Sequence, residues 1–229
     1  MTVSTVLHAE GLLFDLDGVI VDSHEVVERH WRQFASWHGL DATGLSKRAL
    51  GRPSLEAIQR ELPHLSTSEL QEAASRFYVL EETDTAGVTW VVGAETLLDS
   101  LPDDRWAVVT SCGRKLAEAR IDAVGLGSPM HLVTADDVHR GKPDPEGFLA
   151  GASLLDVDAQ RCIVFEDAPT GLEAAVRSGA TPVGVATGTP VDQLRAAMKG
   201  NGVVVEDLRA VTVREAGGVL RVEIEELQR

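Results

Sequence analysis

The sequence predicts an α/β protein in which helices cover both faces of a parallel sheet and a small helical domain is inserted near the N-terminus. Three observations support this prediction. Short apolar runs alternate with helix-like stretches along most of the chain, as in parallel sheets built from crossover units. Residues 107–110 and 162–165 are nearly continuous apolar runs, which suits strands buried on both faces. The interval from Asp15 to Thr110 is too long for one crossover.

The elements of the predicted sheet follow in a regular order. The expected strands are Gly11–Asp15, Trp106–Thr110, His131–Thr134, Cys162–Glu166, Pro182–Ala186 and Val203–Val205. Helical patterns lie between them at Lys115–Val124, Pro145–Leu155, Thr170–Ser178 and Val191–Lys199. At the C-terminus, Val211–Arg214 and Val219–Ile224 flank Glu-Ala-Gly-Gly, which predicts a hairpin.

The long interval is predicted to hold the inserted helical domain, residues 23–86, so that residues 1–22 and 87–229 form one discontinuous core domain. Apolar residues at helical spacing predict a first helix that ends near Gly39, and further patterns cover Leu55–Leu62 and Ser68–Glu81. We expect the aromatic residues of the first helix to form the core of the insert rather than a ligand-stacking surface. The connections near Val21 and Gly87 are the expected hinges.

Composition restricts the partners of this chain. It carries a formal net charge of −15, which argues against nucleic acid and against an anionic membrane surface, because both select basic proteins. Its 2 cysteines form no CxxC pattern. We find no basic-apolar leader and no apolar stretch of about 18 residues, so the expected location is cytoplasmic.

Polar residues lie at or just after the carboxyl ends of three predicted strands, and another lies in the loop that follows a fourth strand. Because ligands of open parallel sheets bind beyond the carboxyl ends of the strands, we expect these side chains to converge in one crevice. The crevice would hold up to four carboxylates, one ammonium group and hydroxyl or backbone donors. The residues are Asp15, Asp17, Thr110, Ser111, Lys142, Glu166 and Asp167.

This set of groups suits phosphate chemistry. Four buried acids would repel one another unless a hard cation such as Mg²⁺ were bound among them, and Mg²⁺ commonly also binds a substrate phosphate. Thr110, the amide that follows it and Lys142 suit the remaining phosphate oxygens. An aspartate can attack phosphorus, and a second acid can protonate the leaving oxygen and then activate water.

The motifs Asp15-Leu-Asp17-Gly-Val, Thr110-Ser, Gly-Lys142-Pro and Glu166-Asp167 resemble, in order, the four motifs of the haloacid dehalogenase superfamily. The resemblance covers essentially the whole chain and implies a Rossmann-like core. The insert is similar to the helical cap of subfamily I. Residues 12–40 and the phosphate-strand and Gly-Lys-Pro motifs most resemble the sugar-phosphatase branch, whose members hydrolyse hexose, deoxyhexose or glycerol phosphates.

The resemblance implies a role for each motif residue. It makes Asp15 the nucleophile and a metal ligand, and Asp17 the acid/base that binds the metal through its carbonyl oxygen. Asp167 completes the Mg²⁺ site, and Glu166 supports the metal through water or orients the loop. The residues implied to bind phosphate or substrate are Thr110, Ser111, Lys142 and Gly18.

Two residues of the insert are further candidates for substrate binding. Arg52 lies in a turn before a helix, where similar sugar phosphatases often have a basic residue that faces the substrate, and a solvated arginine is the alternative. Glu28 on the first helix of the insert would bind a sugar hydroxyl or would be a surface charge. Cys112 has no evident base as partner, so we do not expect a thiol nucleophile.

Two other functions, an isomerase and a binding protein without turnover, stay open at this point, whereas two further enzyme classes are disfavoured. Dehalogenases and phosphonatases lack an acid at the position of Asp17, so its presence disfavours both. β-Phosphoglucomutases carry a cap histidine that helps to time the acid/base residue, and the matching position here is Val27, which weakens the isomerase hypothesis. A binding protein that kept the fold without turnover would have lost the nucleophile or the acid, and neither is lost.

Overall fold

The computed structural model describes residues 3–49 and 53–227 and contains the predicted parallel sheet. Its six strands have the order β6-β5-β2-β7-β8-β9, and every neighbouring pair is parallel. The strand bounds are β2 Gly11–Phe14, β5 Trp106–Val109, β6 Leu132–Val133, β7 Cys162–Glu166, β8 Thr181–Val185 and β9 Val203–Val205. Each predicted strand is present, with ends within two residues of the prediction.

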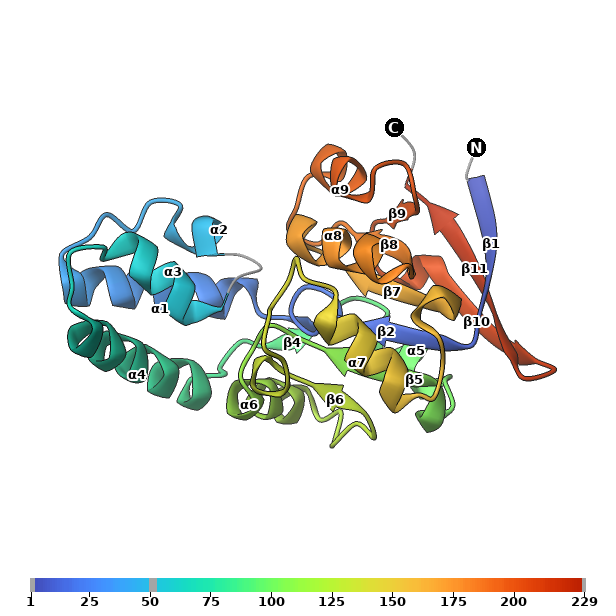
Figure 1. Ribbon diagram of the computed structural model, residues 1–229, viewed down its shortest axis with the longest axis horizontal. Coiled ribbons are helices and arrows are strands. Elements are labelled where there is room, and N and C mark those ends of the chain that lie inside the picture. The colour runs from blue at the N-terminus through green and yellow to red at the C-terminus, as the bar shows by residue number, and fades with distance from the viewer. Residues whose placement is uncertain (1–2, 50–52, 228–229) are drawn as a thin grey trace.

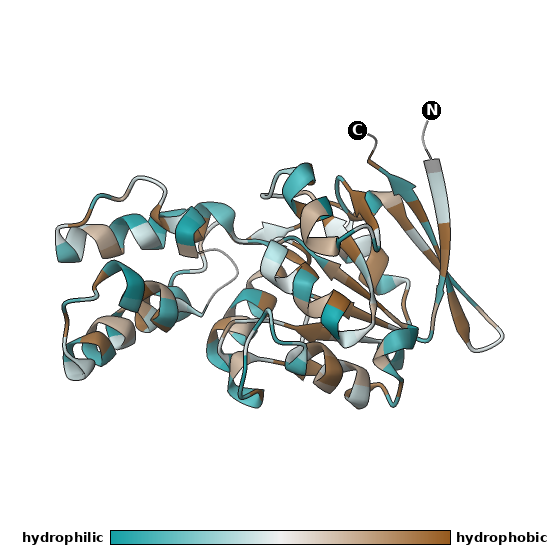
Figure 2. Ribbon diagram, turned by 45° about the horizontal axis from the view of Figure 1, so that its top comes forward, coloured by the Kyte–Doolittle hydropathy of each residue, from teal (hydrophilic) through white to brown (hydrophobic). Residues whose placement is uncertain are grey.

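Helices cover both faces of this sheet, which confirms the predicted fold class (Figure 1). Their bounds are α5 Ala94–Asp99, α6 Arg114–Val124, α7 Glu146–Leu154, α8 Pro169–Ser178 and α9 Val191–Met198. On one face, Leu13 and Val164 pack with Phe148 of α7, and α9 packs on α8. On the other face, Phe14 and Phe165 belong to the core that α5 and α6 share. Figure 2 shows the central strands as mostly hydrophobic.

A second, antiparallel sheet was predicted only in part. The expected hairpin is present as β10 Val211–Ala216 and β11 Val219–Glu226, and β11 also pairs along its length with β1 Val3–Ala9. Strand β1 was not predicted, because its partner lies at the other end of the chain and no local pattern indicates that pairing. Leu220, Val222 and Ile224 of this sheet are buried in the same core as α5 and α6.

Between β3 Val21–Asp22 and β4 Thr89–Trp90, the described residues form four helices that lie as a group of their own at one end of the molecule (Figure 1). They are α1 His24–His38, α2 Leu45–Ala49, α3 Ser54–Glu61 and α4 Thr67–Thr83, of which α2 was not predicted. Trp31, Phe34 and Phe77 pack with ring centroids 4.5–5.3 Å apart, so they form the core of the insert. The boundaries of a separate cap domain at residues 23 and 86 stay a prediction.

Two features of the insert follow from simple helix rules. Helix α1 ends at Gly39, whose φ of 65° suits a glycine cap, and α4 begins with a capping box between Ser66 and Glu69.

No helix among the residues that the structure describes has the length and apolar character needed to cross a bilayer.

Candidate active site

The loop after the central strand β2 carries both aspartates of the first motif. The amide of Asp15 donates to the Phe165 carbonyl at 3.0 Å, which continues the strand pairing beyond β2. Three residues after Asp15, Gly18 has a φ of 81°, which favours glycine. A Cβ on Gly18 would lie 2.3 Å from Oδ2 of Asp167, so the missing side chain leaves room for that carboxylate. The first and fourth motifs therefore meet here.

Lys142 joins the first, third and fourth motifs. Its Nζ donates to Oδ1 of Asp15, to Oε1 of Glu166 at 2.7 Å and to the carbonyl of Val109 at 3.1 Å. Its side chain is 7% exposed, so the ammonium group is held almost entirely by these acceptors. Burial would lower the pKa of Lys142, but Asp15 and Glu166 raise it above the ordinary value, and the group stays charged.

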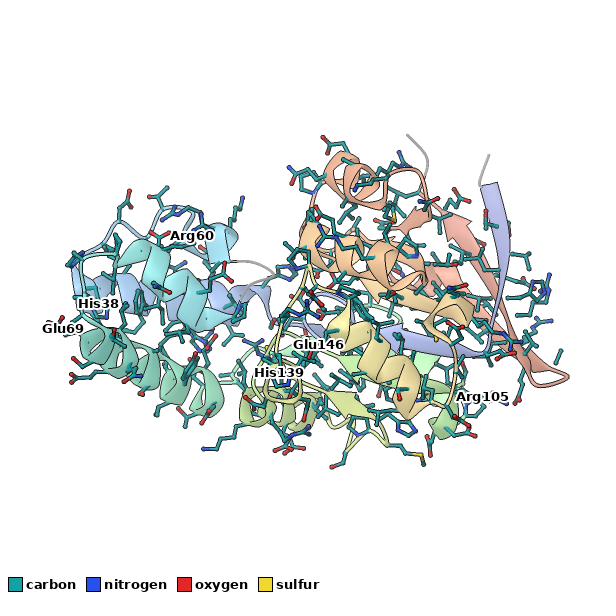
Figure 3. All side chains as sticks on the ribbon, in the orientation of Figure 1. His38, Arg60, Glu69, Arg105, His139 and Glu146 are labelled. Atoms are coloured by element: carbon teal, nitrogen blue, oxygen red, sulfur yellow. The ribbon has the colours of Figure 1, made fainter. Side chains whose placement is uncertain are left out.

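Contacts within the third motif shape the loop that presents Lys142. Oε1 of Glu146 accepts from the amide of His139 at 2.7 Å, and Oε2 accepts from the amide of Arg140 at 3.1 Å. Figure 3 shows the labelled side chains of His139 and Glu146 close together beside α7. The first turn of α7 is thereby tied to the residues immediately before Lys142.

Three carboxylates compete for that one ammonium group. Burial raises the pKa of Asp15 to about 7, and the charge of Glu166 adds to the effect while Lys142 opposes it. Burial and the charges of Glu166 and Asp15 also raise the pKa of Asp167 well above its ordinary value. Oδ2 of Asp167 is buried without a hydrogen-bond partner among the described residues. A cation beside Asp15 and Asp167 would remove both penalties.

These residues fit Mg²⁺ by their chemistry. In the described ranges, no cluster of three or more His, Cys, Asp or Glu side chains is arranged so that it could hold a metal ion by itself. Mg²⁺ does not require such a group, because it is usually held by one or two carboxylates together with waters and substrate phosphate. Asp15 and Asp167 supply two carboxylates, and the buried Oδ2 of Asp167 has no hydrogen-bond partner within residues 3–49 and 53–227. Glu166 is engaged elsewhere, since its Oε2 accepts from the Ala168 amide at 2.7 Å.

Asp17 has a different environment from Asp15. Its Oδ1 accepts from the Ser23 hydroxyl at 2.5 Å, and its Oδ2 accepts from Nη1 of Arg120 at 2.5 Å and from Sγ of Cys112 at 3.1 Å. Burial acts to raise the pKa of Asp17, but Arg120 and the Ser23 hydroxyl outweigh it, so the pKa lies below its ordinary value. The two aspartates are thus perturbed in opposite directions: without a bound cation, the surroundings of Asp15 favour its protonated form and those of Asp17 favour its ionised form.

The second motif lies at the end of β5, close to Lys142. Oγ1 of Thr110 accepts from the Cys112 amide at 3.1 Å, so the threonine shapes the turn that follows. Thr110, Ser111 and Lys142 line one small hollow, together with Pro53 from the segment before α3. This arrangement brings a hydroxyl-bearing turn, the ammonium group and the insert to the same place.

The two candidates in the insert have different outcomes. Arg52 lies outside the described residues, and its role stays a prediction. Glu28 is exposed on α1 and forms an ion pair with Arg32, one helical turn away, at 2.9 Å. This contact is the one expected of a surface charge, and a role of Glu28 in substrate binding stays a prediction.

The family match covers most of the chain. The model of the haloacid dehalogenase-like hydrolase family matches residues 9–179. The chain belongs to this family. The match begins before the first motif and ends after the fourth, so it includes every core residue singled out above. The expectation of a haloacid dehalogenase-type hydrolase, drawn from the four motifs, is confirmed.

This haloacid dehalogenase-like hydrolase is similar to named phosphatases. It is 35% identical over 209 residues to hexitol phosphatase A of Escherichia coli, covering 90% of this chain and 95% of the relative. It is 33% identical over 232 residues to 2-deoxyglucose-6-phosphate phosphatase 2 of Saccharomyces cerevisiae, covering 92% and 94%. A solved β-phosphoglucomutase from Clostridium difficile matches with a TM-score of 0.70 and 27% identity, covering 87% of this chain and 92% of that one.

Two buried charged residues of this hydrolase were not predicted: Arg120, which contacts Asp17, and Glu81, which contacts Arg120. Arg120 lies on the buried face of α6, four residues after Leu116, and Glu81 lies on the buried face of α4, four residues after Phe77. A charged residue at an apolar position of a helical pattern was a usable signal in both cases. Cys112 was set aside as a nucleophile, and burial raises the pKa of its thiol well above the ordinary value, which keeps it protonated.

Proposed function

We propose that this hydrolase cleaves the phosphate monoester of a sugar or polyol through an aspartyl-phosphate at Asp15, with Mg²⁺ as cofactor. The observation that carries the proposal is the buried group of Asp15, Glu166 and Asp167 around the single ammonium of Lys142. Such a group lacks positive charge, which Mg²⁺ would supply, and Mg²⁺ commonly also binds the phosphate of a substrate. The similarity to hexitol and 2-deoxyglucose-6-phosphate phosphatases supports the substrate class.

The first step forms the covalent intermediate. The carboxylate of Asp15 attacks phosphorus, the bond from phosphorus to the alcohol oxygen breaks, and Asp17 gives its proton to the leaving oxygen. Lys142 and the hydroxyl of Thr110 bind phosphoryl oxygens and offset their charge. Mg²⁺, held by the carboxylates of Asp15 and Asp167 and by the carbonyl oxygen of Asp17, would further neutralise the phosphoryl group.

The second step restores the enzyme. Asp17, now ionised, takes a proton from water as the water oxygen attacks phosphorus, and the bond from phosphorus to Asp15 breaks. Inorganic phosphate and a free Asp15 carboxylate result. Glu166 acts on Lys142 rather than on the substrate, because its oxygens contact the ammonium group and the amide of Ala168.

The insert is proposed to select the alcohol. Pro53, just before α3, lines the same hollow as Thr110 and Lys142, so this part of the insert borders the phosphate-binding groups. Closure over the substrate would exclude water during the first step. Arg52 adjoins Pro53 in the sequence and is our proposed contact to the substrate from the insert.

The test is phosphate release from a panel that includes hexitol phosphates, 2-deoxyglucose 6-phosphate and glycerol 1-phosphate. Asp15→Asn and excess EDTA are each expected to abolish turnover, whereas Asp99→Asn, at an exposed position of α5, should leave it unchanged. Comparable turnover by the wild type and by the Asp15→Asn variant would refute the covalent mechanism. Tight binding of the panel without hydrolysis would instead favour a binding protein.

An isomerase is the second candidate, since a solved β-phosphoglucomutase has a similar structure. Val27, the position that matched the mutase histidine, is partly buried against both apolar cores and supplies no proton donor. Incubation with β-glucose 1-phosphate separates the two functions. Free phosphate supports the phosphatase, and accumulation of glucose 6-phosphate would support the mutase.

A further inference from the structure

Arg120 is a buried cation on a helix that packs against both the catalytic loop and the insert. It lies in α6 on the face formed by Leu116, Ala117 and Ile121, and the residue is 4% exposed. An arginine cannot shed its charge in a protein, so a buried guanidinium must be paired. Its partners therefore explain why it occupies an apolar position of the helix.

The guanidinium bridges the two parts of the molecule. Nη1 donates to Oδ2 of Asp17 at 2.5 Å and approaches Sγ of Cys112 at 3.2 Å. Nη2 lies 3.9 Å from Oε1 of Glu81, which belongs to α4 of the insert and is also buried. Oε2 of Glu81 accepts from the hydroxyl of Ser54 on α3 at 2.9 Å. One arginine thus contacts the catalytic loop on one side and the insert on the other.

These contacts make the two oxygens of Asp17 unequal. Oδ2 accepts from Arg120 and Cys112, whereas Oδ1 contacts only the hydroxyl of Ser23 among the described residues. An arginine can only donate, so the bond from Arg120 to Oδ2 favours the form of Asp17 in which Oδ2 carries no proton. A serine hydroxyl can donate or accept, so Oδ1 is free to gain and lose a proton with Ser23 as partner in both states.

We propose that Arg120 is a positioning residue, which holds Oδ2 of Asp17 so that Oδ1 is the oxygen that transfers the proton, and that Glu81 of the insert holds Arg120 in place. The inference rests on the proposed phosphatase function and deepens it. In the first step Oδ1 gives its proton to the leaving alcohol oxygen, and in the second it takes one from the attacking water. Arg120 contacts neither substrate nor phosphorus.

The test compares two substrates that differ in their need for an acid. The leaving oxygen of an alkyl phosphate must be protonated, whereas p-nitrophenolate is a stable anion and leaves without a proton. The value of kcat/KM covers steps up to the release of the alcohol, so it reports only the first step. Each variant is measured with both substrates on one preparation, so a partly unfolded sample lowers both values equally. The alkyl probe is whichever panel member the wild type hydrolyses best.

For Arg120→Met we expect kcat/KM for the alkyl phosphate to fall about 100-fold, the loss typical of a misplaced reacting group. For p-nitrophenyl phosphate kcat/KM should stay within about threefold, while kcat falls because the second step still needs a base. Arg120→Lys keeps one donor for Asp17 and should recover part of the alkyl value. Glu81→Gln should change the ratio in the same sense by a smaller factor.

Arg114→Met is the matched control, because Arg114 is an arginine of the same helix whose ion pair with Asp137 is half exposed. It should leave both values within about twofold of the wild type, as expected for a surface ion pair. Equal losses on both substrates in the Arg120 and Glu81 variants would show a structural role only and overturn the inference, as would no loss at all. If Arg120→Met does not fold, the Arg120→Lys and Glu81→Gln ratios decide. Absence of Asp15-dependent turnover in the wild type would instead refute the proposed function.

Discussion

Replacement of Glu81 by glutamine is expected to stabilise the protein at alkaline pH and much less at acidic pH. Glu81 is 5% exposed on α4, where it accepts from Ser54 and lies 3.9 Å from Arg120. Burial is the largest influence on this carboxyl. Although Arg120 and Ser54 oppose it, burial raises the pKa of Glu81 from its ordinary 4.5 to about 7.

The size and sign of the effect follow from this pKa. Because the native state holds the proton more tightly than the unfolded chain, Glu81 favours folding below its unfolded pKa, and this contribution is lost as pH rises through the native value. The difference between 4.5 and about 7 corresponds to about 3 kcal/mol, since each unit is worth about 1.4 kcal/mol. Glutamine keeps a hydrogen-bonding group and does not titrate.

The assay is urea unfolding of both proteins in EDTA at about pH 4.5 and about pH 8, so that other titrating groups cancel in the difference. The free energy of unfolding of Glu81→Gln relative to wild type should rise by about 3 kcal/mol between these conditions. Glu72→Gln, at an exposed position of the same helix, is the control and should show no such trend. A relative stability of Glu81→Gln that does not change with pH would refute the reasoning.

Two further variants address the core motifs. Gly18→Ala would place a methyl group 2.3 Å from Oδ2 of Asp167, at a residue whose φ is 81°, so we expect Asp167 to be displaced. Activity should then fall at least about 10-fold, and the Mg²⁺ concentration that gives half-maximal activity should rise. A titration of activity with Mg²⁺ measures both quantities, and wild-type values would contradict the proposed contact between Gly18 and Asp167. Lys142→Met removes the cation between Asp15 and Glu166. Steady-state kinetics should show a loss of kcat of about 100-fold or more, and an unchanged kcat would exclude a role in charge stabilisation.

Much of the fold was predictable because its signals are local. The strands of the parallel sheet are short apolar runs, and their order along the chain implied both the sheet and the insert. The missed elements are those without such a signal. Strand β1 is defined by pairing with β11, and the helices α2 and α5 span only 5 and 6 residues.

The candidate site was predictable where it follows strand ends. Asp15, Lys142 and Glu166 were expected in one crevice, and the structure joins them by hydrogen bonds. Glu28 was the weakest candidate, because a charged residue on an amphipathic helix has the same pattern whether it faces a ligand or solvent. Its pairing with Arg32 is a local surface contact.

The sequence by itself determined the α/β class, the family and the groups available for chemistry, because strand ends and motif order are properties of the chain. Only the tertiary structure decided how charge is shared among those groups. In the structure Lys142 pairs with Asp15 and Glu166, and Arg120 pairs with Asp17, whereas Oδ2 of Asp167 has no hydrogen-bond partner in the described part of the chain. Burial and charge proximity depend on which segments meet in space, and these quantities give the two aspartates of the first motif opposite pKa shifts.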